Sequence, residues 1–300
     1  MSRLRVFAYL LMLALVAPSP VDAATVLLRD DFDGCVLDTD LWFVPEGPGT
    51  FFGRTQIRPP AAAPSLAGGV LRLRIDTHNP RALVPGDSFW GSEVATVATY
   101  AVETGLSFRA RARLVPPVRA GMVASLFSFV FLPAIPGRDE IDVELLTNDV
   151  VAARERVLTN AFDDADFAQP GDKAFAGVAG LDLAQFHVFE VRWFTDRVEW
   201  RVDGALVRTE TGTVPDDPQN VRLNFWVPDA FFAEAYDAAL QPAATVGANE
   251  IFVYEVDWVE IRRLGVTPAP GLGSAGGIAA VLLVAGLLRR RAGGRARNAA

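Results

Sequence analysis

The chain has 300 residues, a formal net charge of −8, two histidines and one cysteine. The acidic charge excludes a nucleic-acid partner, because such a surface repels the phosphate backbone. The single cysteine excludes an internal disulfide, and with only two isolated histidines it also excludes a catalytic zinc site.

The N-terminal segment has the layout of a secretory signal peptide. Arg3 and Arg5 precede an apolar run over residues 6–16, and small residues then offer a cleavage site after Ala23. We therefore expect residues 1–23 to direct export. The rest of the chain would lie at an extracellular or periplasmic face.

Residues 24–264 predict one large all-β domain. The two chain ends hold seven arginines and one aspartate, so this region carries a charge of −14. Its length suits a single domain, and short alternating or apolar runs recur with turn residues between them. We expect an antiparallel two-sheet sandwich and no helix longer than a few turns. The expected strands cover residues 70–75, 106–114, 122–132, 186–194, 198–202, 205–209, 221–226 and 252–261, and the longest loops cover 59–67, 163–180 and 228–247.

The most informative stretch is the acidic run at residues 139–144. If it is a strand, its side chains alternate, so Glu140, Asp142 and Glu144 share one face and the apolar residues between them face a core. Three like charges on one face repel one another, and the apolar segment 122–132 before them predicts a buried neighbouring strand. A solvated sheet face would also show acidic residues. Two carboxylates that flank a bond can cleave glycosides, so we interpret the triplet as a substrate cleft.

The C-terminal segment, residues 265–300, predicts a membrane anchor. Residues 271–288 are apolar, and 18 helical residues at about 1.5 Å each span roughly 27 Å, about the thickness of a bilayer core. The arginines from Arg289 to Arg297 would stay in the cytoplasm and leave the main domain outside. A buried C-terminal helix is the alternative. The layout also resembles the PEP-CTERM class of bacterial sorting tails, with Pro268-Ala269-Pro270 in place of Pro-Glu-Pro, which implies processing by a sorting peptidase.

An ordered series of motifs across residues 24–264 resembles glycoside hydrolase family 16, especially its lichenase branch. The run Glu140-Ile141-Asp142-Val143-Glu144 is similar to the family signature. The other motifs are Asp30–Gly34, Leu37-Asp38, Trp42, Gly91–Glu93, Tyr100, Phe186–Phe189, Trp193, Trp200, Val202–Gly204, Leu223–Trp226 and Asp257–Val259. The resemblance implies a concanavalin A-like β-jelly-roll whose concave sheet carries the cleft. It also implies a retaining endo-β-glycanase that hydrolyses a β-linked glucan, β-1,3-1,4 or related, by double displacement.

The resemblance assigns Glu140 as nucleophile, Glu144 as acid/base and Asp142 as the residue that orients and tunes them. Along a strand the two glutamates lie about 13 Å apart at roughly 3.3 Å per residue. Retaining chemistry needs carboxyl groups about 5 to 5.5 Å apart, so their side chains must converge on a concave face. We expect repulsion from Asp142 to help keep Glu144 protonated while hydrogen bonding holds Glu140 ionised. Spacing alone leaves open which glutamate has which role.

The resemblance also implies supporting residues. Glu93, Asn160 and Asn224 would bind sugar hydroxyls, and Trp226 would stack on a pyranose ring. A surface charge and a core tryptophan are the alternatives for Glu93 and Trp226. The family implies a structural calcium held by Asp257, although an aspartate at such a position is commonly only solvated. No cofactor is needed for the chemistry.

Three positions depart from the lichenase pattern. Arg138 stands where a tryptophan is usual, Ala95 replaces an arginine, and Phe162 replaces a tyrosine. Arg138 could pair with a carboxylate or with an anionic substrate, so sulfated and uronic polysaccharides stay open. The single residue between successive acids keeps a regular strand, which favours the lichenase and xyloglucan-active branches over laminarinases.

Two other functions remain open at the level of sequence. A transglycosylase on the same scaffold would pass the glycosyl-enzyme to a sugar hydroxyl instead of water. A lectin-like domain would bind a glycan without cleaving it. The acidic triplet argues against the lectin, because binding alone does not require three repelling carboxylates.

Overall fold

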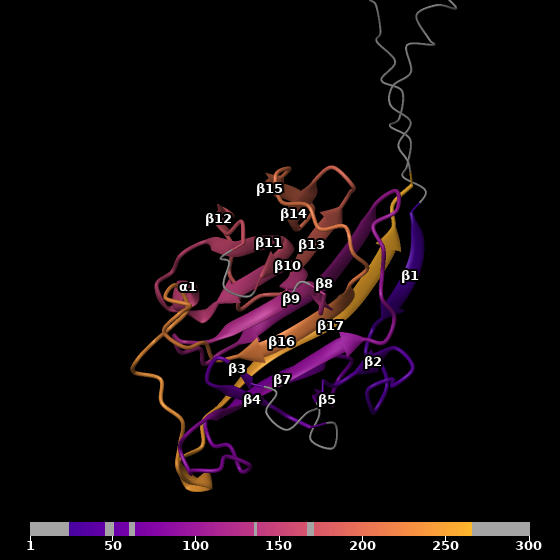
Figure 1. Ribbon diagram of the computed structural model, residues 1–300. Helices are drawn as coiled ribbons and strands as arrows, with labels where there is room; N and C mark the ends of the chain where they lie inside the picture. Colours follow the sequence, from indigo (N-terminus) through magenta and orange to yellow (C-terminus); the bar gives the residue numbers. More distant parts are fainter. Residues whose placement is uncertain (1–23, 46–50, 60–63, 135–136, 167–170, 266–300) are drawn as a thin grey trace, which may run out of the picture. The chain divides into compact units, whose positions relative to one another are not determined.

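A computed structural model describes residues 24–45, 51–59, 64–134, 137–166 and 171–265. These residues form one compact unit of two packed β-sheets, the architecture of a β-jelly-roll sandwich (Figure 1). The expected signal peptide and the expected anchor at 271–288 lie outside the described residues. In the described part of the chain, no helix is long and apolar enough to cross a membrane.

The back sheet is antiparallel. It contains, in spatial order, β15 (Ala205–Glu210), β14 (Val198–Val202), β13 (His187–Trp193), β8 (Leu106–Val115) and β17 (Ile251–Arg263), and the other edge of β17 pairs with β6 (Leu71–Asp76) and β1 (Thr25–Asp30). Every strand expected at 70–75, 106–114, 186–194, 198–202, 205–209 and 252–261 lies in this sheet. Asp203 and Gly204 form the tight turn between β14 and β15, both with positive φ (49° and 81°).

The front sheet is also antiparallel and contains the acidic run. Its spatial order is β12 (Ala174–Gly177), β11 (Arg156–Asp166), β10 (Gly137–Leu146), β9 (Val123–Leu132), β16 (Asn220–Trp226), β7 (Phe89–Thr96) and β2 (Trp42–Phe43). Three short strands complete the described set: β3 (Phe51–Phe52), β4 (Thr55–Ile57) and β5 (Ser65–Leu66). Strand β10 is an interior strand, with β9 and β11 on its two sides (Figure 1).

The core lies between the two sheets. Ile141, Val143 and Leu145 point into it from β10, as the alternation predicts, and they pack among fully buried side chains that include Trp193 and Trp200. The opposite face of β10 is therefore free to line a site. The two-sheet, all-β prediction is confirmed.

The expected loops differ in two places from the structure, and in the first the two-residue strand β5 lies inside the expected loop 59–67. Strand β11 extends to Asp166, and β12 lies inside the range 163–180 that we expected to be irregular. The segment 228–247 is irregular as expected until a 3-10 helix at Val246–Ala248. The α-helix of the described residues is a single short element, α1 (Thr147–Val151).

The arginine-rich face of β8 points to solvent on the back sheet. Arg109 and Arg113 pair with Glu260 and Glu255 of β17, with nitrogen–oxygen distances of 2.6 and 2.7 Å. These pairs neutralise much of the charge on the outer face of the back sheet. This face is distant in the fold from the acidic run, because the core separates the two.

Candidate active site

The acidic run forms a regular stretch of β10. From Glu140 to Glu144 each residue has a consecutive partner on both β9 and β11, and the irregularity in the pairing with β11 falls earlier, between Arg138 and Glu140. Glu140, Asp142 and Glu144 therefore project from the same face, away from the core. The prediction of an unbulged acidic motif is confirmed.

These three carboxylates line a cleft of about 890 Å³ on the outer face of the front sheet. Its walls come from β9, β10, β11 and β16, together with the segment that follows β16. Seven of the expected site residues line it, namely Arg138, Glu140, Asp142, Glu144, Asn160, Asn224 and Trp226. The other two, Glu93 and Asp257, lie elsewhere.

The three carboxylates hold their protons unequally. Burial, together with the charge of Glu140, raises the pKa of Glu144 to about 8. Burial and the charges of both glutamates raise the pKa of Asp142 well above its usual range. Burial also raises the pKa of Glu140, but Arg138 and a hydrogen bond from Asp142 oppose the rise. The surroundings therefore favour the ionised form of Glu140 relative to Asp142 and Glu144, whose charged forms are opposed by burial and by like charges.

We expected repulsion from Asp142 to help keep Glu144 protonated. The like charge that raises the pKa of Glu144 is that of Glu140, and the hydrogen bond between Asp142 and Glu140 lowers the pKa of Glu140. The sequence could not reveal this, because the protonation of three adjacent acids depends on how deeply each is buried.

Arg138 forms an ion pair with Glu140. Its guanidinium carbon lies 3.8 Å from the centre of the Phe162 ring, and the side chains of Arg138 and Glu140 are only 12% and 18% exposed. The two departures from the lichenase pattern at 138 and 162 thus contact each other. Of the two expected partners for Arg138, the structure provides a carboxylate.

Glu93 lies beneath the cleft and not in its wall. Its side chain is fully buried and accepts a hydrogen bond from Nη1 of Arg222 at 2.8 Å. Burial raises the pKa of Glu93 to about 7, and the charge of Arg222 opposes this rise. In this arrangement Glu93 would act on a sugar through Arg222, which does line the cleft.

Arg222 is a cleft residue that our sequence reasoning missed. It lies on β16 directly opposite Ala95 of β7, and its guanidinium carbon is 4.9 Å from the centre of the Phe129 ring. An arginine from β16 therefore stands beside the position where the lichenase pattern places one on β7. The alternation along the strand could have identified Arg222, because it shares a face with Asn224 and Trp226.

The two asparagines lie where expected, and both are nearly buried. Asn160 is opposite Asp142 in the sheet, and its Oδ1 accepts the N–H of Ala161 at 3.0 Å. Asn224 is opposite Glu93, and its Oδ1 has no hydrogen-bond partner among the described residues. Both amides lie at the cleft floor, where a sugar hydroxyl would approach.

Aromatic side chains gather at the Trp226 end of the cleft. The centre of the Trp226 ring lies 6.3 Å from that of Phe52 and 6.1 Å from that of Phe232, and Phe231 beside it is fully exposed. Trp226 is half-buried and lines the cleft, so its ring is available to a pyranose. The phenylalanines of the segment after β16 carry no sequence pattern that would have identified them.

The expected calcium ligand does not have the surroundings of a cation site. Asp257 lies on β17 of the back sheet, and its carboxylate is 2.5 Å from a guanidinium nitrogen of Arg111. A carboxylate already neutralised by an arginine is a poor ligand for a hard cation. Arg111 thus competes with a calcium ion for this carboxylate, and the calcium at this position stays a prediction.

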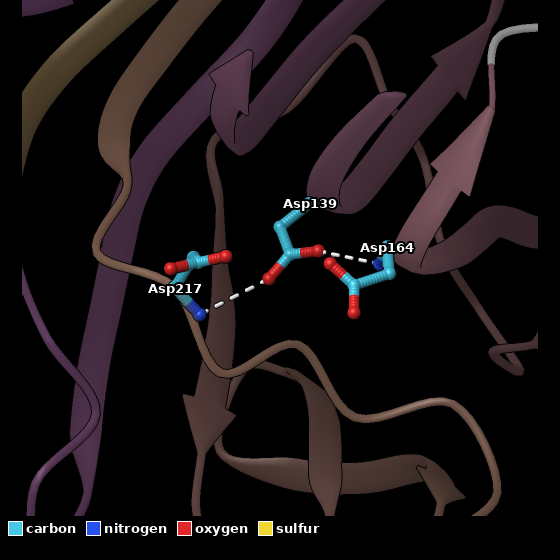
Figure 2. Close-up of side chains that lie close together, drawn as sticks. All are labelled: Asp139, Asp164 and Asp217. Atoms are coloured by element: carbon cyan, nitrogen blue, oxygen red, sulfur yellow. Dashed lines mark hydrogen bonds between the residues drawn. The ribbon is translucent and has the colours of Figure 1, made fainter. Parts of the chain in front are cut away.

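A cluster of aspartates lies at the start of β10, centred on the fully buried Asp139 (Figure 2). Carboxylate oxygens of Asp164 and Asp217, and likewise of Asp163 and Asp216, lie within 4.8 Å of those of Asp139. The Asp139 carboxylate accepts the backbone N–H groups of Asp164, Asp216 and Asp217, at 2.7, 3.1 and 3.1 Å. These bonds fasten β10 to β11 and to the turn before β16, which gives the cluster a structural role.

Two packed antiparallel sheets and a carboxylate-lined cleft on one of them define a β-jelly-roll protein of the carbohydrate-active class. The sequence profile described as "Glycosyl hydrolases family 16" matches residues 69–260. The chain therefore belongs to glycoside hydrolase family 16.

Known relatives agree with this assignment. A β-glucanase from Bacillus amyloliquefaciens is 29% identical over 156 residues, covering 50% of this chain and 57% of that protein. The chain spans about half the length of the curated relatives it matches. Among solved structures, a lichenase from a mouse hindgut metagenome has a TM-score of 0.61 at 23% identity, covering 78% of this chain and 97% of its own. A laminarinase catalytic domain from Thermotoga maritima has 0.62 at 19%, covering 80% and 98%. At these identities the two structures establish the shared fold alone.

Proposed function

We propose that this protein is a retaining endo-β-glycanase that hydrolyses a β-linked glucan, β-1,3-1,4 or related, by double displacement. The observation that carries the proposal is the different surroundings of two glutamates on one face of one strand. Glu140 is ion-paired with Arg138, while the pKa of Glu144 is raised to about 8. Arg138 thus favours the ionised form of Glu140, and the surroundings of Glu144 favour its protonated form, as a nucleophile and an acid require.

The proposed reaction has two steps. Glu144 donates its proton to the glycosidic oxygen while Glu140 attacks the anomeric carbon, so the C–O bond breaks and a glycosyl-enzyme forms. Glu144, now ionised, then takes a proton from water, and the water oxygen displaces Glu140 with a second inversion. Asp142 keeps its own proton throughout and donates a hydrogen bond to Glu140. Two inversions give net retention of the anomeric configuration.

Three features support a neutral glucan as the substrate. Both guanidinium groups in the cleft already hold carboxylates, Arg138 with Glu140 and Arg222 with Glu93. Aromatic rings at the Trp226 end offer faces for pyranose stacking. The β-glucanase relatives, and the solved structures of a lichenase and a laminarinase, are consistent with this choice.

The test is release of reducing sugar by the full chain from mixed-linkage β-glucan, laminarin, xyloglucan, agarose and carrageenan. Glu140→Gln and Glu144→Gln are the controls. Release that is lost in both variants supports the hydrolase and identifies its substrate. If an oligosaccharide of the cleaved glucan is then supplied, products longer than that oligosaccharide would favour the transglycosylase. Binding without cleavage of any glycan would favour the lectin.

We also propose that the protein is exported and held at the membrane. The support is the sequence pattern of residues 1–23 and of the apolar stretch 271–288 with the arginines after it. The Pro-rich segment before that stretch supports processing by a sorting peptidase. Cell fractionation of the full chain and of a chain lacking residues 265–300 tests the anchor, and the mass of the mature C-terminus tests the processing.

A further inference from the structure

The neighbours of Glu140 in the front sheet are both aromatic, and both are covered by arginines. Glu140 is paired with Phe129 on β9 and with Phe162 on β11. The Arg138 guanidinium lies over Phe162 and the Arg222 guanidinium lies over Phe129. The carboxylate is therefore flanked by two positive charges, of which Arg138 contacts it directly and Arg222 is bonded to Glu93 instead.

We propose that Arg138 is a positioning residue for Glu140. The Arg138 guanidinium, stacked on Phe162, fixes the Glu140 carboxylate in place for attack and stabilises its negative charge. The inference rests on the proposed function and deepens it. It gives a mechanistic role to Arg138, one of the residues at which this cleft departs from the lichenase pattern. Arg138 acts through Glu140 and not on the sugar.

The local structure holds Arg138 rigidly enough for this role. Arg138 and Glu140 are two residues apart on the same face of one strand, so their side chains are neighbours. Between them Asp139 points the other way and is fastened by three backbone N–H groups. The Phe162 ring then supports the flat guanidinium from one side.

Arg138 is the main group that stabilises the ionised form of Glu140. The titratable and charged groups that act on Glu140 are Arg138, Asp142 and Glu144 from β10, Arg222 from β16 and Glu93 from β7. Arg138 is the largest influence that favours the ionised form of Glu140, and it opposes the effect of burial. A charge pair that is mostly shielded from water interacts strongly. Without Arg138 the pKa of Glu140 must rise, because burial would remain and its strongest opposing charge would be gone.

A different role for Arg138 would be recognition of an anionic sugar. The two roles separate cleanly by experiment. A recognition residue changes the KM of charged glycans and leaves kcat on a neutral glucan unchanged. A positioning residue changes the titration of Glu140 with no substrate present, and it lowers kcat on a neutral glucan.

The first experiment follows carboxyl titration in the full chain by carbon NMR with carboxyl-labelled glutamate. Loss of one resonance in Glu140→Gln assigns Glu140. We expect Arg138→Met to raise the pKa of Glu140 and Arg138→Lys, which keeps the charge, to restore most of the wild-type titration. Arg197→Met is the matched control, because its guanidinium lies 3.9 Å from the Phe194 ring centre and pairs with Glu199 at 2.8 Å on the back sheet. It removes the same kind of stacked ion pair away from the cleft and should leave Glu140 unchanged.

The second experiment measures kcat and KM against pH on the glucan that wild type cleaves. We expect Arg138→Met to move the acid limb of kcat/KM to higher pH and to lower kcat about tenfold to a hundredfold, with little change in KM. Thermal melting verifies folding, and Arg138→Gln replaces the methionine variant if that variant does not fold.

An unchanged titration of Glu140 in a folded Arg138→Met protein overturns the inference. So does a rise in KM confined to charged glycans. If wild type cleaves nothing and yet Arg138→Met raises the pKa of Glu140, the positioning role stands and the proposed function fails instead.

Discussion

The indole nitrogen of Trp200 donates a 2.8 Å hydrogen bond to the backbone carbonyl of Asp142, joining the back sheet to the middle of the acidic motif. Trp200 is almost fully buried and comes from β14, on the other side of the core. The bond fixes the position of β10 relative to the back sheet. The position of the cleft carboxylates therefore depends on a residue that no substrate touches.

Replacing Trp200 should reduce both stability and activity. We expect Trp200→Phe to lower the free energy of unfolding by about 1 to 3 kcal/mol, since it leaves a buried carbonyl without its donor. Trp193→Phe is the control, because the Trp193 indole donates at 2.7 Å to the carbonyl oxygen of Pro215, in the turn before β16, and makes no bond to the acidic motif itself. Denaturant unfolding should show similar losses for both, while kcat should fall mainly in Trp200→Phe. Equal kcat in the two folded variants would contradict the link.

The pH dependence of activity should have a basic limb set by Glu144. Because the acid must be protonated and its pKa is raised to about 8, kcat/KM should fall as pH rises through about 8. Lys173 lowers this pKa and Glu234 raises it, and these two side chains form a salt bridge of 2.7 Å with each other. Lys173→Met should thus move the basic limb to higher pH, and Glu234→Gln should move it to lower pH. A shift in the same direction for both would refute the assignment.

Gly171 should tolerate no side chain. It has a φ of +66°, and an added Cβ would lie 2.6 Å from Oδ1 of Asn160 and 2.8 Å from the carbonyl oxygen of Ala161. Gly180 has a similar φ of +78° but open space around its Cβ position, which makes it the matched control. Gly180→Ala should cost about 1 to 2 kcal/mol of unfolding free energy for the left-handed backbone. Gly171→Ala should cost about 1 to 3 kcal/mol more through overpacking and should weaken glucan binding at Asn160. Equal melting temperatures for the two variants would disprove this.

Arg54 should hold in place the segment that carries Phe231 and Phe232. Its guanidinium donates to the carbonyl oxygens of Pro228, Asp237 and Leu240, at 3.0, 3.2 and 2.9 Å. Arg54→Lys cannot reproduce this fork of donors, so we expect KM for long oligosaccharides to rise with little change in kcat. Kinetics on oligosaccharides of increasing length provide the measurement.

Arg119→Lys is the control for the loss of a guanidinium, since Arg119 makes only an exposed pair with Glu250 among the contacts described for it. An exposed pair contributes little, so its kinetics should match wild type. If Arg54→Lys also matches wild type at every length, this segment does not bind the glucan.

Removal of calcium should leave stability unchanged if Asp257 serves only Arg111. We expect a chelator not to move the melting temperature of wild type. A drop that is present in wild type and absent in Asp257→Asn would instead establish a calcium ion at this position, as the family resemblance implies.

The alternation of residues 139–144 was enough to predict the strand, its orientation and the three carboxylates. Each depends on a period of two and on the core on the other face, which are local properties of the sequence. Asn160, Asn224 and Trp226 came from the family resemblance, and the structure places all three in the cleft.

The rest depends on contacts between distant segments. Glu93 alternates correctly, but the sequence does not reveal that Arg222 covers it. The proximity of Lys173 to Glu234 joins two segments that carry no periodic pattern. The short strand β12 lies within a range expected to be a loop, because four residues are too few for a pattern. Protonation of the motif follows burial, which no spacing encodes.

The most direct test of the central claim is to follow the anomeric protons of newly released ends by proton NMR during hydrolysis of the preferred glucan. The account predicts that the β-anomer forms first, that the α-anomer follows only by mutarotation, and that Glu140→Gln abolishes the reaction. Initial release of the α-anomer, or normal hydrolysis by Glu140→Gln, would contradict a double displacement at Glu140.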